Sequence, residues 1–381
     1  MKNIMLMTPG PTTIHESVRM AASLPITNPD LDPSYYEFHK KTCDDLKAIF
    51  HTQNETLILD GEGILGLEAS CASLIEPGDR VLCIDNGIFG NGFGDFAKMY
   101  GAEVIYFKTD YEKSVSPELL ESFLAEDHNF KLATLVHCET PSGITNPVDQ
   151  ICPILKKYGM LSVVDSVSAL GGEELFVDDW QMDVVIAGSQ KCLSAAPGLT
   201  LMSISSDAWN MIESRKSPIT GFYLNLTIWK NWYENKWFPY TQPISQIYQL
   251  EVALTRAIND SALISRHHQM AQATRESFIK AGFDLYAKDG FSNTVTTVCM
   301  PIGMTFKELF DTLLEEHSIL IGGGIGHLKD QVFRIGHMGE NCYPDKIWLT
   351  LRALDQVFEK FNIKKSSSLH KNFTEEISSF I

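Results

Sequence analysis

Between about residues 56 and 205, short apolar runs alternate with amphipathic stretches, and this alternation limits the fold more than any other feature. Helix-like segments, such as 65–74, 117–124 and 148–158, separate most of the runs. Apolar, often β-branched runs joined by helical connections are typical of a largely parallel sheet that is covered on both faces. The seven predicted strands are 56–60, 80–85, 102–108, 132–138, 161–166, 184–189 and 199–205.

The pattern changes after residue 260, where helices and short strands alternate less regularly. The predicted elements are helices over 264–281, 306–316 and 344–361, with strands over 294–300, 319–321 and 331–335. We therefore predict a large α/β domain over residues 1–255, with an N-terminal arm (1–20) at the functional site. A smaller α+β domain follows over 256–363. The polar, Ser-rich residues 364–381 are predicted to form a loosely held tail.

Charge and cysteine usage exclude several classes of function. The formal net charge of −17 repels nucleic acid and anionic membranes, so neither is an expected partner. No apolar run is long enough to span a bilayer, and no secretory apolar segment precedes Pro9. The eight cysteines form no Cys-x-x-Cys pair and no ligand spacing with histidine. We expect a cytoplasmic protein with reduced thiols and no metal site.

Polar residues follow the predicted strands where a ligand is expected. In open α/β sheets, ligands bind beyond the carboxyl ends of the strands. The residues at or just after these ends are Asp60, Asp85, Glu139, Asp165 and the pair Gln190–Lys191.

The most informative of these are Asp165 and Lys191, each of which closes a predicted buried strand. A pyridoxal enzyme needs a lysine that holds the cofactor as a Schiff base. It also needs a carboxylate against the pyridine nitrogen, which keeps that nitrogen protonated. A buried structural ion pair explains the same two residues equally well when they are taken alone.

Eight segments in order narrow this choice. They are Thr8–Thr12 (Thr-Pro-Gly-Pro-Thr), Leu67-Glu68-Ala69, 76–82, 86–90, 139–143, Asp165-Ser166-Val167, Ser189-Gln190-Lys191 and Phe333-Arg334-Ile335-Gly336. Together they resemble the class V pyridoxal-dependent aminotransferases over nearly the whole chain, and in particular their alanine–glyoxylate and serine–glyoxylate branch.

The resemblance implies roles for individual residues. Lys191 would be the Schiff-base lysine that moves the proton during transamination, and Asp165 would pair with the pyridine nitrogen. Phe89 would stack on one face of the ring, and Val167 would cover the other. Arg334 would bind the substrate carboxylate, which suits a planar guanidinium. A structural carboxylate is the alternative partner for Arg334.

The resemblance also assigns Gly61, Glu62, Gly63, Ser142, Gln190 and Thr241 to cofactor binding. Relatives usually have small or hydroxyl residues in the first of these turns, whereas this chain has Gly61-Glu62-Gly63-Ile64. Phe238 stands where a partner-subunit Tyr usually contributes a phosphate ligand.

Glu62 makes the form of the cofactor an open question. The N-terminus of a helix attracts an anion, and Glu62 itself can be that anion and repel a phosphate. The turn resembles that of pyridoxamine–pyruvate aminotransferases, which use free pyridoxamine or pyridoxal as substrate. The alternative is that Glu62 points to solvent and that backbone N–H groups hold pyridoxal 5'-phosphate.

Three competing hypotheses remain. Residues 61–66 fit Gly-x-Gly-x-x-Gly, and Asp85 follows the next strand as a ribose-binding acid would in a dinucleotide fold. That hypothesis gives no role to Asp165, Lys191 or Arg334. A lyase of the same fold would keep Lys191 and Asp165, and a non-catalytic pyridoxal-binding protein would not need Arg334 as well.

We therefore predict pyridoxal fold type I, with a mainly parallel seven-stranded sheet in the large domain and a smaller C-terminal α+β domain. The resemblance implies a homodimer in which Thr241 reaches the partner's site. It also implies transamination from a small-molecule amino donor, with pyridoxamine itself as one candidate, to a 2-oxo acid such as pyruvate or glyoxylate.

Overall fold

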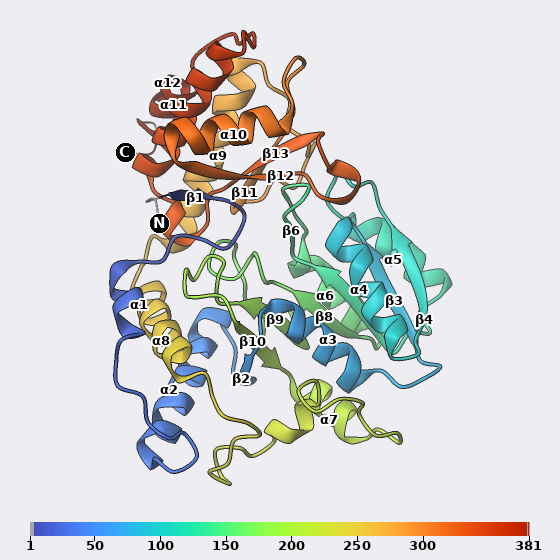
Figure 1. Ribbon diagram of the computed structural model, residues 1–381. Helices are drawn as coiled ribbons and strands as arrows, with labels where there is room; N and C mark the ends of the chain where they lie inside the picture. Colours follow the sequence, from blue (N-terminus) through green and yellow to red (C-terminus); the bar gives the residue numbers. More distant parts are fainter. Residues whose placement is uncertain (1–3, 379, 381) are drawn as a thin grey trace.

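A computed structural model describes residues 4–378 and 380 and contains two main sheets, each with its own helices (Figure 1). The larger sheet has the strand order β2-β10-β9-β8-β5-β3-β4. All neighbouring strands in it are parallel except β10, which runs antiparallel to both β2 and β9. Its strands are β2 (Glu55–Asp60), β3 (Arg80–Asp85), β4 (Glu103–Lys108), β5 (Leu132–Val136), β8 (Leu161–Asp165), β9 (Val184–Gly188) and β10 (Leu199–Ile204).

The centre of this sheet is completely buried, because every residue of β5, β8, β9 and β10 is shielded from solvent. Such strands need helices on both faces. The helices of this part are α1 (Glu16–Ala21), α2 (Pro33–Phe50), α3 (Gly63–Leu74), α4 (Ile88–Met99), α5 (Pro117–Glu126), α6 (Val148–Lys157), α7 (Ser206–Glu213), η1 (Leu226–Trp229) and α8 (Ile244–Ile258). Their apolar side chains and those of the strands form one continuous core.

The seven predicted strands are confirmed, with ends that differ by no more than two residues from the prediction. The predicted helices 65–74, 117–124 and 148–158 correspond to α3, α5 and α6. The strand predicted over 132–138 is divided, because β5 ends at Val136 and β6 (Cys138–Glu139) pairs separately with β7 (Ile144–Thr145).

The smaller sheet has the order β1-β12-β13-β11 and lies above the large sheet in Figure 1. Its strands are β1 (Met5–Met7), β11 (Val295–Cys299), β12 (Ile319–Gly323) and β13 (Val332–Gly336). Its helices are α9 (Leu263–Ala281), α10 (Phe306–His317), η2 (Gly326–Leu328), η3 (Gly339–Asn341), α11 (Pro344–Lys360) and α12 (Leu369–Ser378). These elements share a second apolar core.

Residues 5–7 belong to the small sheet, although we predicted that residues 1–255 form one large domain. β1 pairs in parallel with β12, and Met7 is fully buried among small-sheet side chains. The predicted boundary at residue 255 also falls within α8. Residues 5–7 therefore belong to the small sheet, although they precede every element of the large one.

The prediction of a loosely held tail over residues 364–381 is wrong for most of that segment. Residues 369–378 form α12, which packs against α9 and α11. Leu369 and Phe373 stand one turn apart, and both are buried in the second core. Together with the partly buried Ile377, these apolar side chains at helical spacing hold α12 in place.

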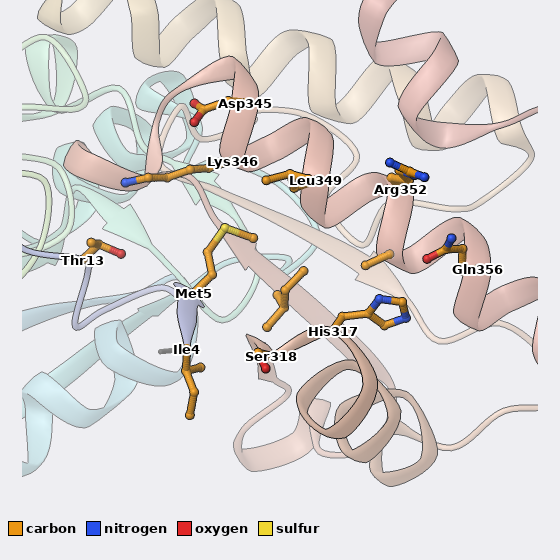
Figure 2. Close-up of a pocket in the computed structure, with 12 residues that line it drawn as sticks. Ile4, Met5, Thr13, His317, Ser318, Asp345, Lys346, Leu349, Arg352 and Gln356 are labelled. Carbon is orange, nitrogen blue, oxygen red and sulfur yellow. The ribbon is translucent and has the colours of Figure 1, made fainter. Parts of the chain in front are cut away.

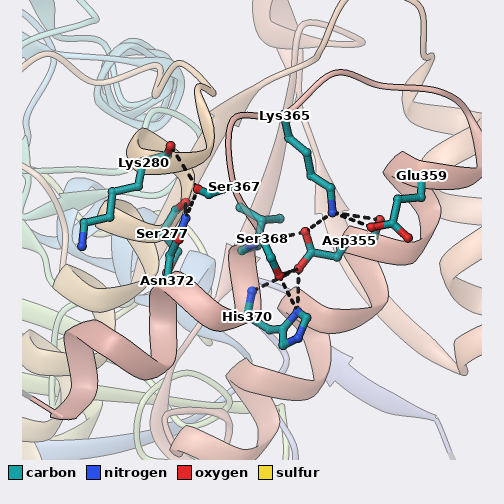
Figure 3. Close-up of polar contacts among 10 residues, drawn as sticks. Ser277, Lys280, Asp355, Glu359, Lys365, Ser367, Ser368, His370 and Asn372 are labelled. Atoms are coloured by element: carbon teal, nitrogen blue, oxygen red, sulfur yellow. Dashed lines mark hydrogen bonds and ion pairs between the residues drawn. The ribbon is translucent and has the colours of Figure 1, made fainter.

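Asp355 of α11 fixes the start of α12 through a group of hydrogen bonds (Figure 3). Its carboxylate accepts from Lys365 Nζ at 2.5 Å, from the Ser368 hydroxyl at 2.8 Å and from the backbone N–H of Leu369 at 3.0 Å. His370 Nδ1 lies 2.6 Å from the same carboxylate. Burial opposes the charge, but these hydrogen bonds hold the pKa of Asp355 below its ordinary value.

We expect Asp355→Asn to lower the free energy of unfolding by about 2–4 kcal/mol, because it leaves the largely buried Lys365 with only the exposed Glu359 as counter-charge. Urea denaturation measures this loss, and limited proteolysis should show earlier cleavage around α12.

Glu359→Gln is the matched control, because Glu359 pairs with the same Lys365 but is 68% exposed. Exposed pairs contribute little, so the control should change stability by about 0.5 kcal/mol or less. Equal effects of the two substitutions would contradict the role given to Asp355.

Candidate active site

The candidate site lies at the carboxyl ends of β8 and β9, which are parallel neighbours in the large sheet. Asp165 is the last residue of β8, and Lys191 stands three residues after the end of β9. Asp165 lies close enough to Lys191 for their charges to interact. The sheet order therefore brings together two residues that are separated by an entire crossover connection in the sequence.

The amine of Lys191 is held by the N-terminal segment. Its Nζ donates to the carbonyl oxygen of Pro9 at 2.6 Å, and a Cβ added at Gly10 would lie only 2.5 Å from the same nitrogen. Thr12 joins the segment to the lysine loop through its N–H, which donates to the Gln190 carbonyl at 3.2 Å. Burial lowers the pKa of Lys191, and the nearby Asp165 opposes that shift.

Asp165 is buried, and its carboxylate accepts one hydrogen bond from the described part of the chain. The N–H of Val167 donates to Oδ1 at 2.9 Å. Burial raises the pKa of Asp165 to about 6, while the Val167 N–H and Lys191 favour its ionised form. The second carboxylate oxygen remains available for a protonated ring nitrogen.

Glu62 is the N-cap residue of α3. Its Oε1 accepts from the backbone N–H of Ile64 at 3.3 Å, and its side chain is exposed in the single chain. Glu62 is also close enough to Asp165 to affect the ionisation of that carboxylate. A negative side chain therefore stands at the helix N-terminus where relatives are expected to bind phosphate.

Gly61 and Gly63 on either side of this cap are tightly packed against neighbouring side chains. A Cβ at Gly63 would lie 2.6 Å from Val167 Cγ2, so the first turn of α3 packs directly on Val167. Thr200 of β10 fixes the turn from below, because its hydroxyl donates to the carbonyl oxygens of Gly61 and Glu62 at 3.0 and 2.7 Å.

Phe89 lies in the first turn of α4, and its side chain is partly exposed. Its position depends on Glu139, which is fully buried on β6. The N–H groups of Phe89 and Gly90 each donate to one Glu139 oxygen at 3.0 Å. Glu139 thus holds the start of α4 against the β6–β7 hairpin.

Arg334 comes from β13 in the small sheet, where it is 9% exposed. Its Nε donates to the Gly323 carbonyl at 2.8 Å. Burial lowers the pKa of Arg334 to about 10, and Glu139 lies close enough to favour its charged form. The two parts of the molecule therefore meet where Arg334 faces Glu139.

Three other predicted ligands differ in how they are placed. The buried Oε1 of Gln190 has no hydrogen-bond partner in the described part of the chain. The Ser142 hydroxyl is buried in the β6–β7 turn and donates to the Glu139 carbonyl at 3.1 Å. Thr241 is exposed before α8, and none of the interactions found among the described residues joins it to Lys191 or Asp165.

These features fit a flat heteroaromatic ligand. A lysine amine and a carboxylate converge, Gln190 carries an unpartnered buried oxygen in the described chain, and Gly10 and Gly63 let the backbone approach Lys191 and Val167 closely. The residues suited to hold a pyridoxal ring are therefore present together.

Sequence reasoning missed the contacts of Pro9, Gly10 and Glu139. The Thr8–Thr12 motif and the strand-end position of Glu139 were visible in the sequence, but neither indicates which atom the residue contacts. The available sequence signals were therefore the motif and the strand-end position, and neither predicts a chemical role.

The dinucleotide hypothesis loses its ribose ligand in this structure. Both oxygens of Asp85 already accept hydrogen bonds, one from the Tyr111 hydroxyl and the other from Asn91 Nδ2 at 2.9 Å. Asp85 is also buried. Together with Glu62 at the helix N-terminus, this arrangement leaves no place for a pyrophosphate and its ribose.

Other surface features carry no comparable chemistry. Across residues 4–378 and 380, no group of three His, Cys, Asp or Glu side chains is arranged to hold a metal ion, and no helix is long and apolar enough to cross a membrane. Figure 2 shows a pocket of about 570 Å³ between β1, the end of α10 and α11, lined in part by Met5, His317 and Arg352. It contains none of the predicted site residues.

Comparison with known proteins gives consistent matches. The model of the family described as aminotransferase class-V matches residues 30–332. Pyridoxamine–pyruvate transaminase of Mesorhizobium japonicum is 32% identical, covering 92% of this chain and 90% of that protein. Alanine–glyoxylate aminotransferase of Drosophila melanogaster is 29% identical, covering 96% and 95%. The crystal structure of ureidoglycine–glyoxylate aminotransferase from Bacillus subtilis superposes with a TM-score of 0.95 at 27% identity, covering 99% of both chains.

We expect Gly63→Ala to lower the free energy of unfolding by about 1–3 kcal/mol, because the added methyl group would overlap Val167. Gly92→Ala in α4 is the control, since a Cβ there meets nothing within 4 Å and alanine favours a helix. Chemical denaturation of the cofactor-free protein measures both. A neutral Gly63→Ala would mean that α3 does not pack tightly on Val167.

Proposed function

Since this chain belongs to the class V aminotransferase family, we propose that it moves an amino group onto a small 2-oxo acid such as pyruvate or glyoxylate. The observation that carries this proposal is the convergence of Lys191, Asp165 and Arg334 from three strands of two sheets. This set provides an amine, a carboxylate for a ring nitrogen and a cation for the substrate carboxylate.

A pyridoxal group, when bound, withdraws electrons from the substrate carbon and carries the amino group between donor and acceptor. Lys191 would hold the carbonyl carbon of that group and afterwards move the proton between carbon atoms as a neutral amine. Its lowered pKa supports this role, because only the unprotonated amine accepts a proton. Asp165 would keep the ring nitrogen protonated.

The remaining predicted residues would orient the reactants. Phe89 and Val167 would cover the two faces of the ring, and Arg334 would bind the carboxylate of the 2-oxo acid. Burial of Arg334 strengthens its attraction for an anion, because little water screens the charge. Ser142, Gln190 and Thr241 would provide further polar contacts.

We further propose that the amino donor is unphosphorylated pyridoxamine and that pyridoxal is the product. The N-cap carboxylate of Glu62 supports this, because it already satisfies the helix N-terminus and would repel a phosphate dianion. The similarity to pyridoxamine–pyruvate transaminase supports it as well. A pyridoxal-phosphate-dependent alanine– or serine–glyoxylate transaminase is the alternative, and the exposure of Glu62 in the single chain favours it.

We propose that the active form is a homodimer. Several large apolar side chains are exposed. They include Ile64 (40%), which follows the cofactor turn in sequence, and Phe222 (56%) and Trp237 (49%), which lie in the segment before α8. Tyr223 stacks on Tyr240, whose charge environment includes Asp60 beside the cofactor turn. Covering these side chains with a second copy would bring its Thr241 toward the site.

We also propose a cytoplasmic location. All eight cysteines are unpaired, and seven of them are buried. Free thiols in such number are usual in a reducing compartment.

The donor is tested by absorbance titration of cofactor-free protein with pyridoxal and, separately, with pyridoxal phosphate. We expect pyridoxal to bind at least about tenfold more tightly, and Glu62→Gln to reverse or remove that preference by eliminating one negative charge. Glu68→Gln removes a charge farther along α3 and should leave the preference unchanged. Stronger binding of pyridoxal phosphate that Glu62→Gln does not alter would establish the alternative.

Lys191→Ala is the control for the central assignment. It should abolish the absorbance change with either ligand, because no amine would remain to react with the aldehyde. If the change persists, the assignment of Lys191 is wrong.

The dimer is tested by light scattering on the purified protein. We expect twice the chain mass for the unmodified protein and one chain mass for Trp237→Glu, because a charge in a buried apolar interface is costly. Ile302→Glu changes an equally apolar and fully exposed residue near β11, away from the proposed interface, and should remain dimeric. A monomeric unmodified protein would contradict the proposal.

A further inference from the structure

Glu139 is the one fully buried carboxylate between the two residues expected to contact the cofactor and the substrate, Phe89 and Arg334. One of its oxygens accepts from the Phe89 N–H and the other from the Gly90 N–H, both at 3.0 Å. The side chain lies so close to the chain before α4 that a Cβ at Gly87 would be 2.5 Å from Glu139 Cγ. Its position is therefore fixed by backbone atoms.

Charged and titratable groups face Glu139 from every side. Arg334 of β13 is the cation among them, and Asp85 at the end of β3 and Asp165 at the end of β8 add negative charge. The Tyr111 hydroxyl, from the loop after β4, is also close enough to interact. The first turn of α4 contributes two N–H groups. The fixed carboxylate of Glu139 thus lies near Arg334, the residue proposed to bind the substrate carboxylate.

An incoming substrate anion would meet this carboxylate at the same arginine. Arg334 cannot fully neutralise two carboxylates, and a second negative charge in a buried site is costly. Burial raises the pKa of Glu139 to about 7, and the Phe89 and Gly90 N–H groups oppose that rise. Glu139 is therefore expected to exchange a proton near neutral pH.

We propose that Glu139 is a positioning residue that serves as the resident counter-charge of Arg334 and takes up a proton from solvent when the substrate carboxylate binds. One proton is added to a Glu139 oxygen for each carboxylate bound, so the charge of the site is preserved. The positive charge of Arg334 then acts on the substrate carboxylate without a second ionised carboxylate nearby. This proposal rests on the proposed function, because it requires that Arg334 bind the 2-oxo acid.

The sign of the pH dependence follows from linkage. A substrate carboxylate raises the pKa of Glu139, so the protonated form must bind the substrate more tightly. A rise of about one pH unit corresponds to about tenfold weaker binding once Glu139 is ionised. Affinity should therefore fall as pH rises through about 7.

The test is calorimetric titration with pyruvate of the enzyme loaded with the pyridoxal form that it binds, which lacks an amino group to transfer. Between pH 6 and 8.5, we expect the dissociation constant to increase about tenfold. Two buffers of different ionisation enthalpy at pH 7.5 should reveal an uptake of about half a proton per pyruvate. Binding without proton uptake by the unmodified enzyme would overturn the proposal without any variant.

Glu139→Gln keeps the shape of the side chain and removes its titration. We expect its pyruvate affinity to vary less than about twofold over the same pH range and to exceed that of the unmodified enzyme at pH 8.5. Glu173→Gln is the matched control, because Glu173 is also a buried carboxylate with raised pKa but is bonded to Thr145, Ser292 and Asn293. It should retain the original pH profile.

Two failures remain distinguishable. If Arg334→Lys leaves pyruvate binding unchanged, the carboxylate site proposed above is wrong. If Arg334→Lys weakens binding while Glu139→Gln retains the original pH profile, Glu139 serves only to hold α4 and this further inference is wrong.

Discussion

The parallel pairing of β8 with β9 is the constraint on which the rest of the site depends. Asp165 pairs with Ile186 in this register, so the chain leaving β9 reaches Lys191 beside the end of β8. Both strands are completely buried, and a lone charge at such a position would be costly. The carboxylate and the amine stabilise each other's charged forms there. The apolar strands beneath them limit the access of water.

The lysine also couples the two sheets. Residues 5–7 pair with β12, residues 9–12 contact the lysine loop, and a Cβ at Gly336 of β13 would lie 2.1 Å from the Thr8 carbonyl oxygen. The segment from Met5 to Thr12 thus belongs to the small sheet at one end and contacts Lys191 at the other. Any shift of Arg334 with the small sheet would also move the group that holds Nζ. The positions of the Arg334 guanidinium and the Lys191 amine are therefore linked through this segment.

Much of the fold could be predicted because buried parallel strands produce continuous apolar runs, and all seven strands were found in this way. α12 could not, because the burial of its apolar residues Leu369, Phe373 and Ile377 depends on contacts with α9 and α11. β1 escaped for a similar reason, since three residues carry no period and pair with a strand more than 300 positions away. Whether such short elements form depends on pairing with segments far away in the sequence.

The site shows the same division. The sequence indicated Asp165, Lys191 and Arg334 through strand ends and motifs, but it did not indicate which groups surround them. The contacts of Glu139 depend on the close approach of a hairpin to the Gly87–Gly90 backbone. The placement of Thr241 depends on a surface that a single chain leaves exposed.

The balance of charge around the site links the proposed substrate to this arrangement. Two basic side chains, Lys191 and Arg334, stand among the carboxylates of Asp165, Glu139 and Glu62, and Asp85 is close by. A phosphate group would add a charge of about −1.5 to −2 to a site that already has more negative than positive side chains. Uncharged hydroxyl and hydroxymethyl groups of pyridoxamine add none, and the single carboxylate of a 2-oxo acid can be offset by one proton. This balance of charge supports the proposed pairing of a ring without phosphate and a monoanionic acceptor over a pair of reactants that brings phosphate.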